Sequence, residues 1–144
     1  MSDDSEILLH ATTVAWAGNG VLILGKSGAG KSSLALHLMA LGCDLVADDR
    51  TVLCREENQL IARCPEPIQG QIEAHSFGIL QIGFVDSAKI ACVVDLDKQE
   101  AQRLPSPKST EICGVTCPVF HKCDIAVLPF ALLQYLKGSS LLSV

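Results

Sequence analysis

The sequence predicts an α/β domain with a mixed, strand-rich sheet, few helices and a phosphate-binding loop. Residues 25–32 read Gly-Lys-Ser-Gly-Ala-Gly-Lys-Ser and match the phosphate-loop pattern G-x-x-x-x-G-K-S/T. The apolar run Val21–Leu24 precedes this loop, and Leu34, Leu38 and Leu41 follow it at helical spacing. Short apolar runs bounded by polar residues, glycine or proline then recur along the chain, which is typical of strands.

Composition indicates one domain with an ample core. The chain has 144 residues, of which 49% are hydrophobic, so a single domain over residues 1–144 is expected. The net charge of -5 and the absence of a Lys/Arg cluster argue against a nucleic-acid-binding surface. No apolar run reaches the roughly 18 residues of a membrane span, and the first six residues are acidic, unlike a signal peptide. We therefore expect a cytoplasmic protein with no membrane partner.

The first strands predict a hairpin that leads into the loop. Ile7–Trp16 is expected to form one strand, residues 18–20 (Gly-Asn-Gly) a tight turn, and Val21–Leu24 an antiparallel return strand. If the last two residues of that turn are central, the register brings His10 level with Ala29, facing the phosphates. The alternative is a histidine on an exposed strand, and the residues alone leave both open.

The loop predicts binding of a nucleoside triphosphate. Its glycines let the backbone fold tightly, so that N–H groups point at an anion where the positive end of a helix dipole lies. Lys31 is expected to reach the outer phosphates, and the Ser32 hydroxyl to bind Mg²⁺. The residues expected to contact nucleotide are Gly25, Lys26, Ser27, Gly28, Ala29, Gly30, Lys31, Ser32 and Ser33.

Two acids follow the next predicted strand. Gly42 is expected to end the helix, and the apolar residues 45–47 then lead directly into Asp48, Asp49 and Arg50. In phosphate-loop proteins ligands gather at the carboxyl ends of strands, and neighbouring side chains on a strand face opposite ways. One carboxylate could therefore serve a metal while the other serves a proton. The alternative is a solvated acidic turn.

The remainder reads as further strands and irregular segments. Predicted strands cover Thr51–Cys54, Leu60–Cys64, Ile79–Val85 and Lys89–Leu96, and Val119 lies in another apolar strand. Two segments read as loops, residues 65–78, which carry Glu73 and His75, and residues 99–109. Residues 125–136 are expected to form a strand that turns into a short helix after Pro129.

The seven cysteines are expected to be reduced. Cys43, Cys54, Cys64 and Cys92 are scattered singly and suit small buried hydrophobes. The denser group at residues 113–123 contains no C-x-x-C pair, so a zinc site is not favoured.

Together these features resemble a known family. The order of His10, the phosphate loop, the run Ala-Asp-Asp-Arg at 47–50, and Glu73 ahead of Phe-Gly-Ile at 77–79 resembles the catalytic C-terminal domain of HPr kinase/phosphorylase. The similarity spans nearly the whole chain, which looks like the short, single-domain form. The resemblance implies a fold related to phosphoenolpyruvate carboxykinase around the nucleotide site.

It also implies an ATP- and Mg²⁺-dependent protein-serine kinase. Its protein substrate would be HPr, a phosphocarrier of the phosphotransferase system, and the family also runs the reverse phosphorolysis of phosphoserine-HPr. Longer members form hexamers, which leaves a homo-oligomer open here, although the shorter length of this chain weakens the transfer of that assembly.

The resemblance assigns roles to individual residues. Asp49 would accept the serine proton, His10 would orient Asp49, and Lys31 would neutralise phosphate. Ser32, Asp48 and Glu73 would supply oxygen ligands to Mg²⁺. The chain departs from the family where an arginine follows the glutamate and where another follows the Pro-Val strand, and here His75 and Lys122 are the nearest candidates for phosphate contact. These departures bear on phosphorolysis and on the choice of protein substrate.

Two other functions are compatible with the loop. A small-molecule kinase of the shikimate or adenylate type would need several arginines to clamp two substrates, and the chain has only Arg50, Arg55, Arg63 and Arg103. A non-catalytic nucleotide sensor would keep the loop without the chemistry, and His10, Asp49 and Glu73 argue against it.

Overall fold

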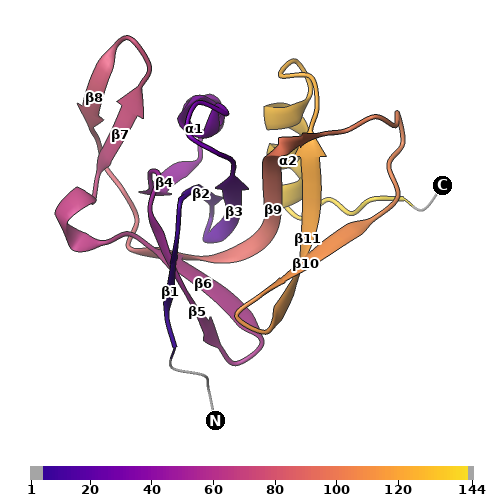
Figure 1. Ribbon diagram of the computed structural model, residues 1–144, viewed down its shortest axis with the longest axis horizontal. Helices are drawn as coiled ribbons and strands as arrows, with labels where there is room; N and C mark the ends of the chain where they lie inside the picture. Colours follow the sequence, from indigo (N-terminus) through magenta and orange to yellow (C-terminus); the bar gives the residue numbers. More distant parts are fainter. Residues whose placement is uncertain (1–4, 143–144) are drawn as a thin grey trace.

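The computed structural model describes residues 5–142, which form a strand-rich α/β fold with two α-helices (Figure 1). The elements are β1 (Ile7–Leu9), β2 (Ala11–Trp16), β3 (Asn19–Leu24), α1 (Lys31–Ala40), β4 (Asp44–Ala47), β5 (Thr51–Glu56), β6 (Gln59–Arg63), the 3-10 helix η1 (Glu66–Ile68), β7 (Gln71–Ala74), β8 (Gly78–Gln81), β9 (Ser87–Gln99), β10 (Lys108–Ile112), β11 (Val115–Lys122) and α2 (Leu128–Leu136). None of these helices is long and apolar enough to cross a membrane.

The main sheet brings four strand ends to one edge. Its strands are ordered β1-β5-β6-β9-β3-β2-β4, with β11 pairing to β9 and β10 to β11. Strand β3 pairs with β9 in parallel, and β9 with β11 in parallel. Both β3 and β4 run antiparallel to β2, so they share a direction. The carboxyl ends of β3, β4, β9 and β11 therefore lie at the same edge, where ligands of α/β sheets collect.

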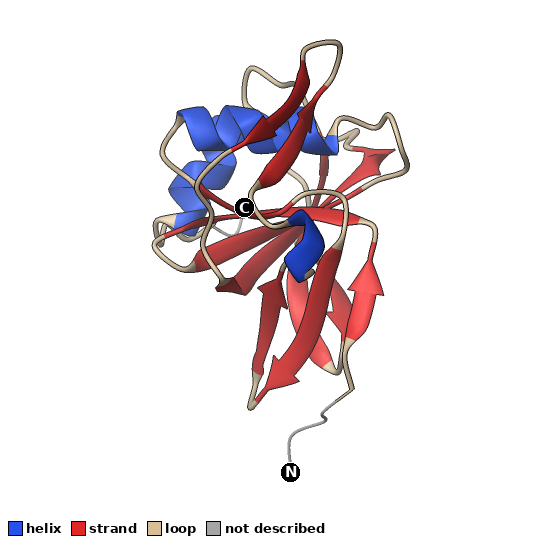
Figure 2. Cartoon of the chain, turned by 90° about the vertical axis from the view of Figure 1, so that its left-hand side faces the viewer, coloured by secondary structure: helices blue, strands red, loops and turns tan. Residues whose placement is uncertain are grey.

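Both faces of the central strands are covered. On one face, Ile23 of β3 and Val94 of β9 belong to the cluster that α1 and α2 complete with Leu38 and Leu132. Figure 2 shows the helices gathered on this side of the sheet. On the other face, Leu22 of β3 and Val93 of β9 pack against residues of β5, β6, β10 and β11 in a second cluster. Because these strands are buried on both faces, they are continuous apolar runs, as the sequence indicated.

The turn of the first hairpin lies two residues earlier than predicted. Ala17 and Gly18, with φ of 48° and 84°, form the turn, and Ala11 pairs with Leu24. Two left-handed residues suit the twist of a two-residue hairpin, although alanine seldom adopts this conformation. Gly20 lies within β3 instead, where a Cβ would approach Ala88 Cβ at 3.3 Å. The predicted strand over residues 7–16 is also interrupted by a bend at position 10.

Three other segments differ from their predictions. The stretch 65–78 is not a plain loop, because it contains η1 and the strand β7, which pairs with β8 as a separate hairpin. Its Ile72 is fully buried against the core. The strand has only four residues, too few for a pattern of alternating apolar and polar residues to reveal this anchor. Strand β8 ends at Gln81 rather than at Val85, and β10 begins within the second predicted loop.

The C-terminal segment has no strand before its helix. Asp124 makes the turn instead, because its carboxylate accepts a hydrogen bond from Ala126 N at 2.9 Å and its carbonyl accepts one from Leu128 N at 2.9 Å. Helix α2 starts at Leu128, and Pro129 lies in its first turn, where a missing N–H costs little. The predicted end of α1 is confirmed, since Gly42 follows it with a φ of 110°.

The stability of the fold is expected to fall at alkaline pH because of its buried thiols. None of the seven cysteines, which all lie within residues 5–142, forms a disulfide. Burial raises the pKa of Cys92 to about 12 and that of Cys43 to about 11, from 9.0. Above pH 9.0, the ordinary pKa of a thiol, the unfolded chain loses thiol protons that the folded chain keeps. The free energy of unfolding should therefore decrease as pH rises, by up to ~1.4 kcal/mol per pH unit for each thiol.

Urea unfolding at about pH 8 and about pH 10.5 measures this effect. Cys92→Ala should show a smaller loss of stability between the two conditions than the unaltered chain. An equal loss in both proteins would contradict the assignment to Cys92.

Candidate functional site

The loop predicted to bind phosphate connects β3 to α1 at the shared strand edge. A Cβ on Gly25 would lie 2.9 Å from Ala29 Cβ, so only glycine allows the loop to close on itself. Gly30 precedes the helix with a φ of 102°, a left-handed conformation that glycine adopts without strain. Lys31 is then the first residue of α1. The predicted order of strand, loop and helix is confirmed.

Lys31 is held inside the loop. Its side chain is only 6% exposed, and Nζ donates hydrogen bonds to Gly25 O at 2.7 Å and to Lys26 O at 3.4 Å. Asp49 Oδ1 lies 3.6 Å from the same Nζ, on a side chain that is 59% exposed. The loop thus encloses one cation, and its nearest acid faces solvent.

Asp48 is the centre of the hydrogen-bond network at the site. Its Oδ1 accepts hydrogen bonds from Ser32 Oγ at 2.6 Å and from Thr12 Oγ1 at 3.0 Å. Its Oδ2 accepts a hydrogen bond from Glu73 N at 3.0 Å. One carboxylate therefore joins α1, β2, β7 and the end of β4, which fixes its oxygens beside the first turn of α1.

Thr12 is a site residue that the sequence reasoning missed. It is fully buried, and its hydroxyl donates to Asp48 while accepting a hydrogen bond from Asp49 N at 3.0 Å. This contact holds Asp49 in a left-handed conformation with a φ of 65°. A threonine inside a strand has no motif to mark it, and only the pairing of β2 with β4 brings it to the acids.

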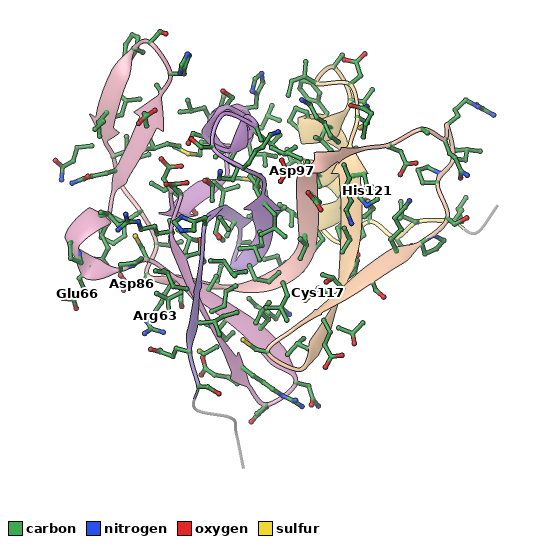
Figure 3. The ribbon with its side chains drawn as sticks, viewed as in Figure 1. Arg63, Glu66, Asp86, Asp97, Cys117 and His121 are labelled. Carbon is green, nitrogen blue, oxygen red and sulfur yellow. The ribbon has the colours of Figure 1, made fainter. Side chains whose placement is uncertain are left out.

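Asp97 was also missed, although the sequence contained a signal for it. Both carboxylate oxygens lie 3.1 Å from Lys26 N, and Asp97 N donates to Asp95 Oδ1 at 2.9 Å. Figure 3 shows Asp97 at the carboxyl end of β9, beside the loop. The apolar residues 91–94 lead into these acids in the same way that β4 leads into Asp48. The parallel pairing of β3 and β9 then places them at the loop.

The other predicted site residues are more dispersed. His10 is exposed at the bend before β2 and lies level with the start of the loop, not with Ala29 as predicted. His75 occupies the exposed turn between β7 and β8, whereas Lys122 ends β11 on the far side of β3 (Figure 1). Within residues 5–142, no hydrogen bond or ion pair joins any of these three side chains to Asp48 or Asp49. Their roles stay predictions.

Two cavities flank the loop. One, of about 160 Å³, lies beside the acids and is lined by Asp48, Asp49, Arg50, Ile72, Glu73 and Ile79, among others. The other, of about 310 Å³, lies on the opposite side, between β3, β9, β10 and β11. In the described part of the chain, no three His, Cys, Asp or Glu side chains are grouped to hold a metal ion by themselves.

The chain matches a known protein family. Residues 4–121 match the family model described as the HPr Serine kinase C-terminal domain. The chain belongs to this family.

Curated relatives of this chain include proteins named HPr kinase/phosphorylase. The one from Azoarcus sp. (strain BH72) is 45% identical over 142 residues, which cover 85% of this chain and 45% of the relative. The one from Aromatoleum aromaticum is 38% identical over 140 residues, covering 88% of this chain and 43% of the relative. The chain thus spans less than half the length of these curated relatives.

A solved structure has the same fold. The Hpr(Ser) kinase/phosphatase from Coxiella burnetii superposes with a TM-score of 0.78 at 27% identity, covering 92% of this chain and 95% of that one. The strand-rich α/β fold with few helices, and the resemblance to HPr kinase/phosphorylase, are confirmed.

Removing the Thr12 hydroxyl is expected to loosen the acidic pair. Thr12→Val keeps the side-chain shape but leaves Asp49 N unpaired and takes one donor from Asp48, so we expect a loss of ~1–3 kcal/mol in the free energy of unfolding. Urea denaturation measures the loss. Thr12→Ser, which keeps the hydroxyl, should lose clearly less. If Thr12→Val were as stable as the unaltered chain, the hydrogen bonds of the hydroxyl would not contribute to stability. A loss confined to Thr12→Ser would assign the effect to packing of the methyl group.

Proposed function

We propose that this chain transfers the γ-phosphoryl group of ATP to a serine hydroxyl of the phosphocarrier protein HPr. The observation that carries the proposal is the distance of 3.6 Å between Asp49 Oδ1 and Lys31 Nζ. A carboxylate able to accept a proton thus lies beside a cation able to neutralise a phosphate. The names of the curated relatives and of the Coxiella burnetii structure support HPr as the protein substrate.

The loop is suited to hold the phosphates. Its N–H groups and the N-terminus of α1 favour an anion, and Lys31 is already buried among oxygens at this point. Phosphate oxygens would replace Gly25 O, Lys26 O and Asp49 as partners of Nζ. Binding of ATP therefore releases the Asp49 carboxylate from Lys31 and leaves it available to the acceptor.

The oxygens near the start of α1 fit Mg²⁺. Ser32 Oγ and Asp48 Oδ1 lie 2.6 Å apart, and hydroxyl and carboxylate oxygens are the ligands that this ion prefers. When bound with ATP, Mg²⁺ supplies neutralisation of the phosphate charge. Glu73 contributes its backbone N–H to Asp48, and its exposed side chain is the third proposed metal-side group.

The acceptor serine would enter the smaller cavity beside Asp49. Its hydroxyl oxygen forms a bond to the γ-phosphorus as the bond from that phosphorus to the bridging oxygen of ADP breaks, and the hydroxyl proton passes to Asp49. In the reverse direction, inorganic phosphate attacks phosphoserine, Asp49 returns the proton, and pyrophosphate leaves. Such chemistry depends on positioning and charge more than on covalent help, and the fixed Asp48 and Lys31 provide both.

Phosphate incorporation from γ-labelled ATP into HPr of the same organism tests the proposal. We expect label on one serine, identified by mass spectrometry, and none on an HPr variant in which that serine is alanine. Label that persists on the variant, or its absence from HPr while ATP is still bound, would contradict the assignment. The second outcome would favour the nucleotide-sensor or small-molecule-kinase readings.

A further inference from the structure

The larger cavity begins where the phosphate-binding loop begins. Leu24, the last residue of β3, lines it, and the next residue is the first glycine of the loop. Asp95 on β9 and His121 on β11 line the cavity as well, and Figure 3 shows His121 on the strand beside β9. A ligand whose phosphates occupied the loop could therefore continue directly into this space.

The direction of phosphoryl transfer decides which way the ligand must extend. Attacking and leaving oxygens lie roughly in line, on opposite sides of the transferred phosphorus. Asp49, at the end of β4, marks the acceptor side of the loop. In the sheet, β2 and β4 lie on one side of β3, and β9 and β11 lie on the other. We therefore expect ADP to lie on the side of β9 and β11. The larger cavity is on that side.

The volumes of the two cavities agree with this division. Pockets for small molecules usually measure ~300–1,000 Å³. At about 310 Å³ the cavity between β3 and β11 reaches this range, whereas the one beside Asp49, at about 160 Å³, does not. The smaller cavity suits a serine side chain presented by a protein, and the larger one suits a nucleoside.

We propose that the cavity between β3, β9, β10 and β11 binds the nucleoside of ATP. Its lining includes the apolar side chains of Leu24, Val93 and Val119, against which a base can pack, and the cationic side chains of Lys98 and Lys108. Its wall carries hydrogen-bonding groups from Asp95 and His121, and the Asp95 carboxylate is a suitable acceptor for ribose hydroxyls. This inference rests on the proposed function and adds to it a subsite for the part of ATP that the loop does not hold.

A substitution that fills the cavity separates nucleoside binding from phosphate binding. Ser109, exposed on β10, lines the cavity, whereas Thr116, exposed on the paired strand β11, does not. Isothermal titration of Mg²⁺-ADP and of Mg²⁺-pyrophosphate would be compared for the unaltered chain, Ser109→Trp and the matched control Thr116→Trp.

We expect Ser109→Trp to weaken ADP binding by about tenfold or more while pyrophosphate binding stays within about twofold, and Thr116→Trp to change neither. Retained pyrophosphate binding also shows that the variant is folded. ADP affinity that is unchanged in Ser109→Trp would overturn the proposed subsite. If the unaltered chain bound neither ligand, the proposed function itself would fail. If it bound pyrophosphate as tightly as ADP, only the nucleoside subsite would be overturned.

Photolabelling gives a second test on the unaltered chain. An ADP analogue with an azide on its adenine should label peptides from residues 91–98 or 108–122, which border the cavity. Excess pyrophosphate should reduce this labelling, because it competes for the loop. Labelling confined to residues 66–81, beside the smaller cavity, would overturn the inference.

Discussion

Asp49→Asn is expected to lower the rate of phosphoryl transfer from ATP to HPr by about 10²- to 10⁴-fold, the usual contribution of a general base. Asparagine keeps the size of the side chain but cannot take the serine proton. The ion pair that is lost involves a side chain that is 59% exposed, so stability should change by only ~0–1 kcal/mol. Initial rates of label incorporation measure the effect.

Nucleotide binding provides the control for this variant. Because ATP replaces Asp49 as the partner of Lys31, Asp49→Asn should bind ATP at least as tightly as the unaltered chain. Transfer that continues at a normal rate would exclude Asp49 as the base. A parallel loss of ATP affinity would instead assign Asp49 to nucleotide binding.

Lys31→Met is expected to impair both binding and chemistry. Lys31 is 6% exposed, and methionine can fill its space without supplying charge to the phosphates. Removing one preorganised group that stabilises transition-state charge typically costs about 10²- to 10³-fold in rate. We expect a loss of at least this size in transfer to HPr, together with weaker binding of ATP and of pyrophosphate.

A lysine outside the site separates this effect from a change in net charge. Lys89 is exposed near the start of β9, so Lys89→Met should leave transfer and binding unchanged. Equal losses in both variants would indicate a general electrostatic effect. If Lys31→Met bound pyrophosphate normally, the loop would not be holding phosphate through this side chain.

Much of the site could be predicted because its main parts are contiguous in sequence. The loop, the strand before it and the helix after it are neighbours along the chain, and their residue types directly express the backbone and charge that a phosphate site needs. Asp48 and Asp49 could be placed for the same reason, since an apolar run ending in acids marks a strand tip. The same pattern precedes Asp95 and Asp97, which shows that the signal was present but not applied there.

Other features depend on the pairing of distant segments. Local sequence favoured a turn at Gly-Asn-Gly, whereas Ala17 adopts the left-handed turn and Gly20 lies close against β9, so the level of His10 was wrong. Strand β7 was read as part of a loop because its anchor is a buried contact of Ile72 with the core.

The sequence alone therefore determined the strand-loop-helix unit, the strand-rich fold class and the acids beside the loop, because each is set by residues close together in the chain. Tertiary structure alone decided that Thr12, Ser32 and Glu73 N share the carboxylate of Asp48. It also decided that Asp97 holds the loop and that the two cavities lie on opposite sides of it. These arrangements follow from strand order and register, which depend on the packing of the whole core.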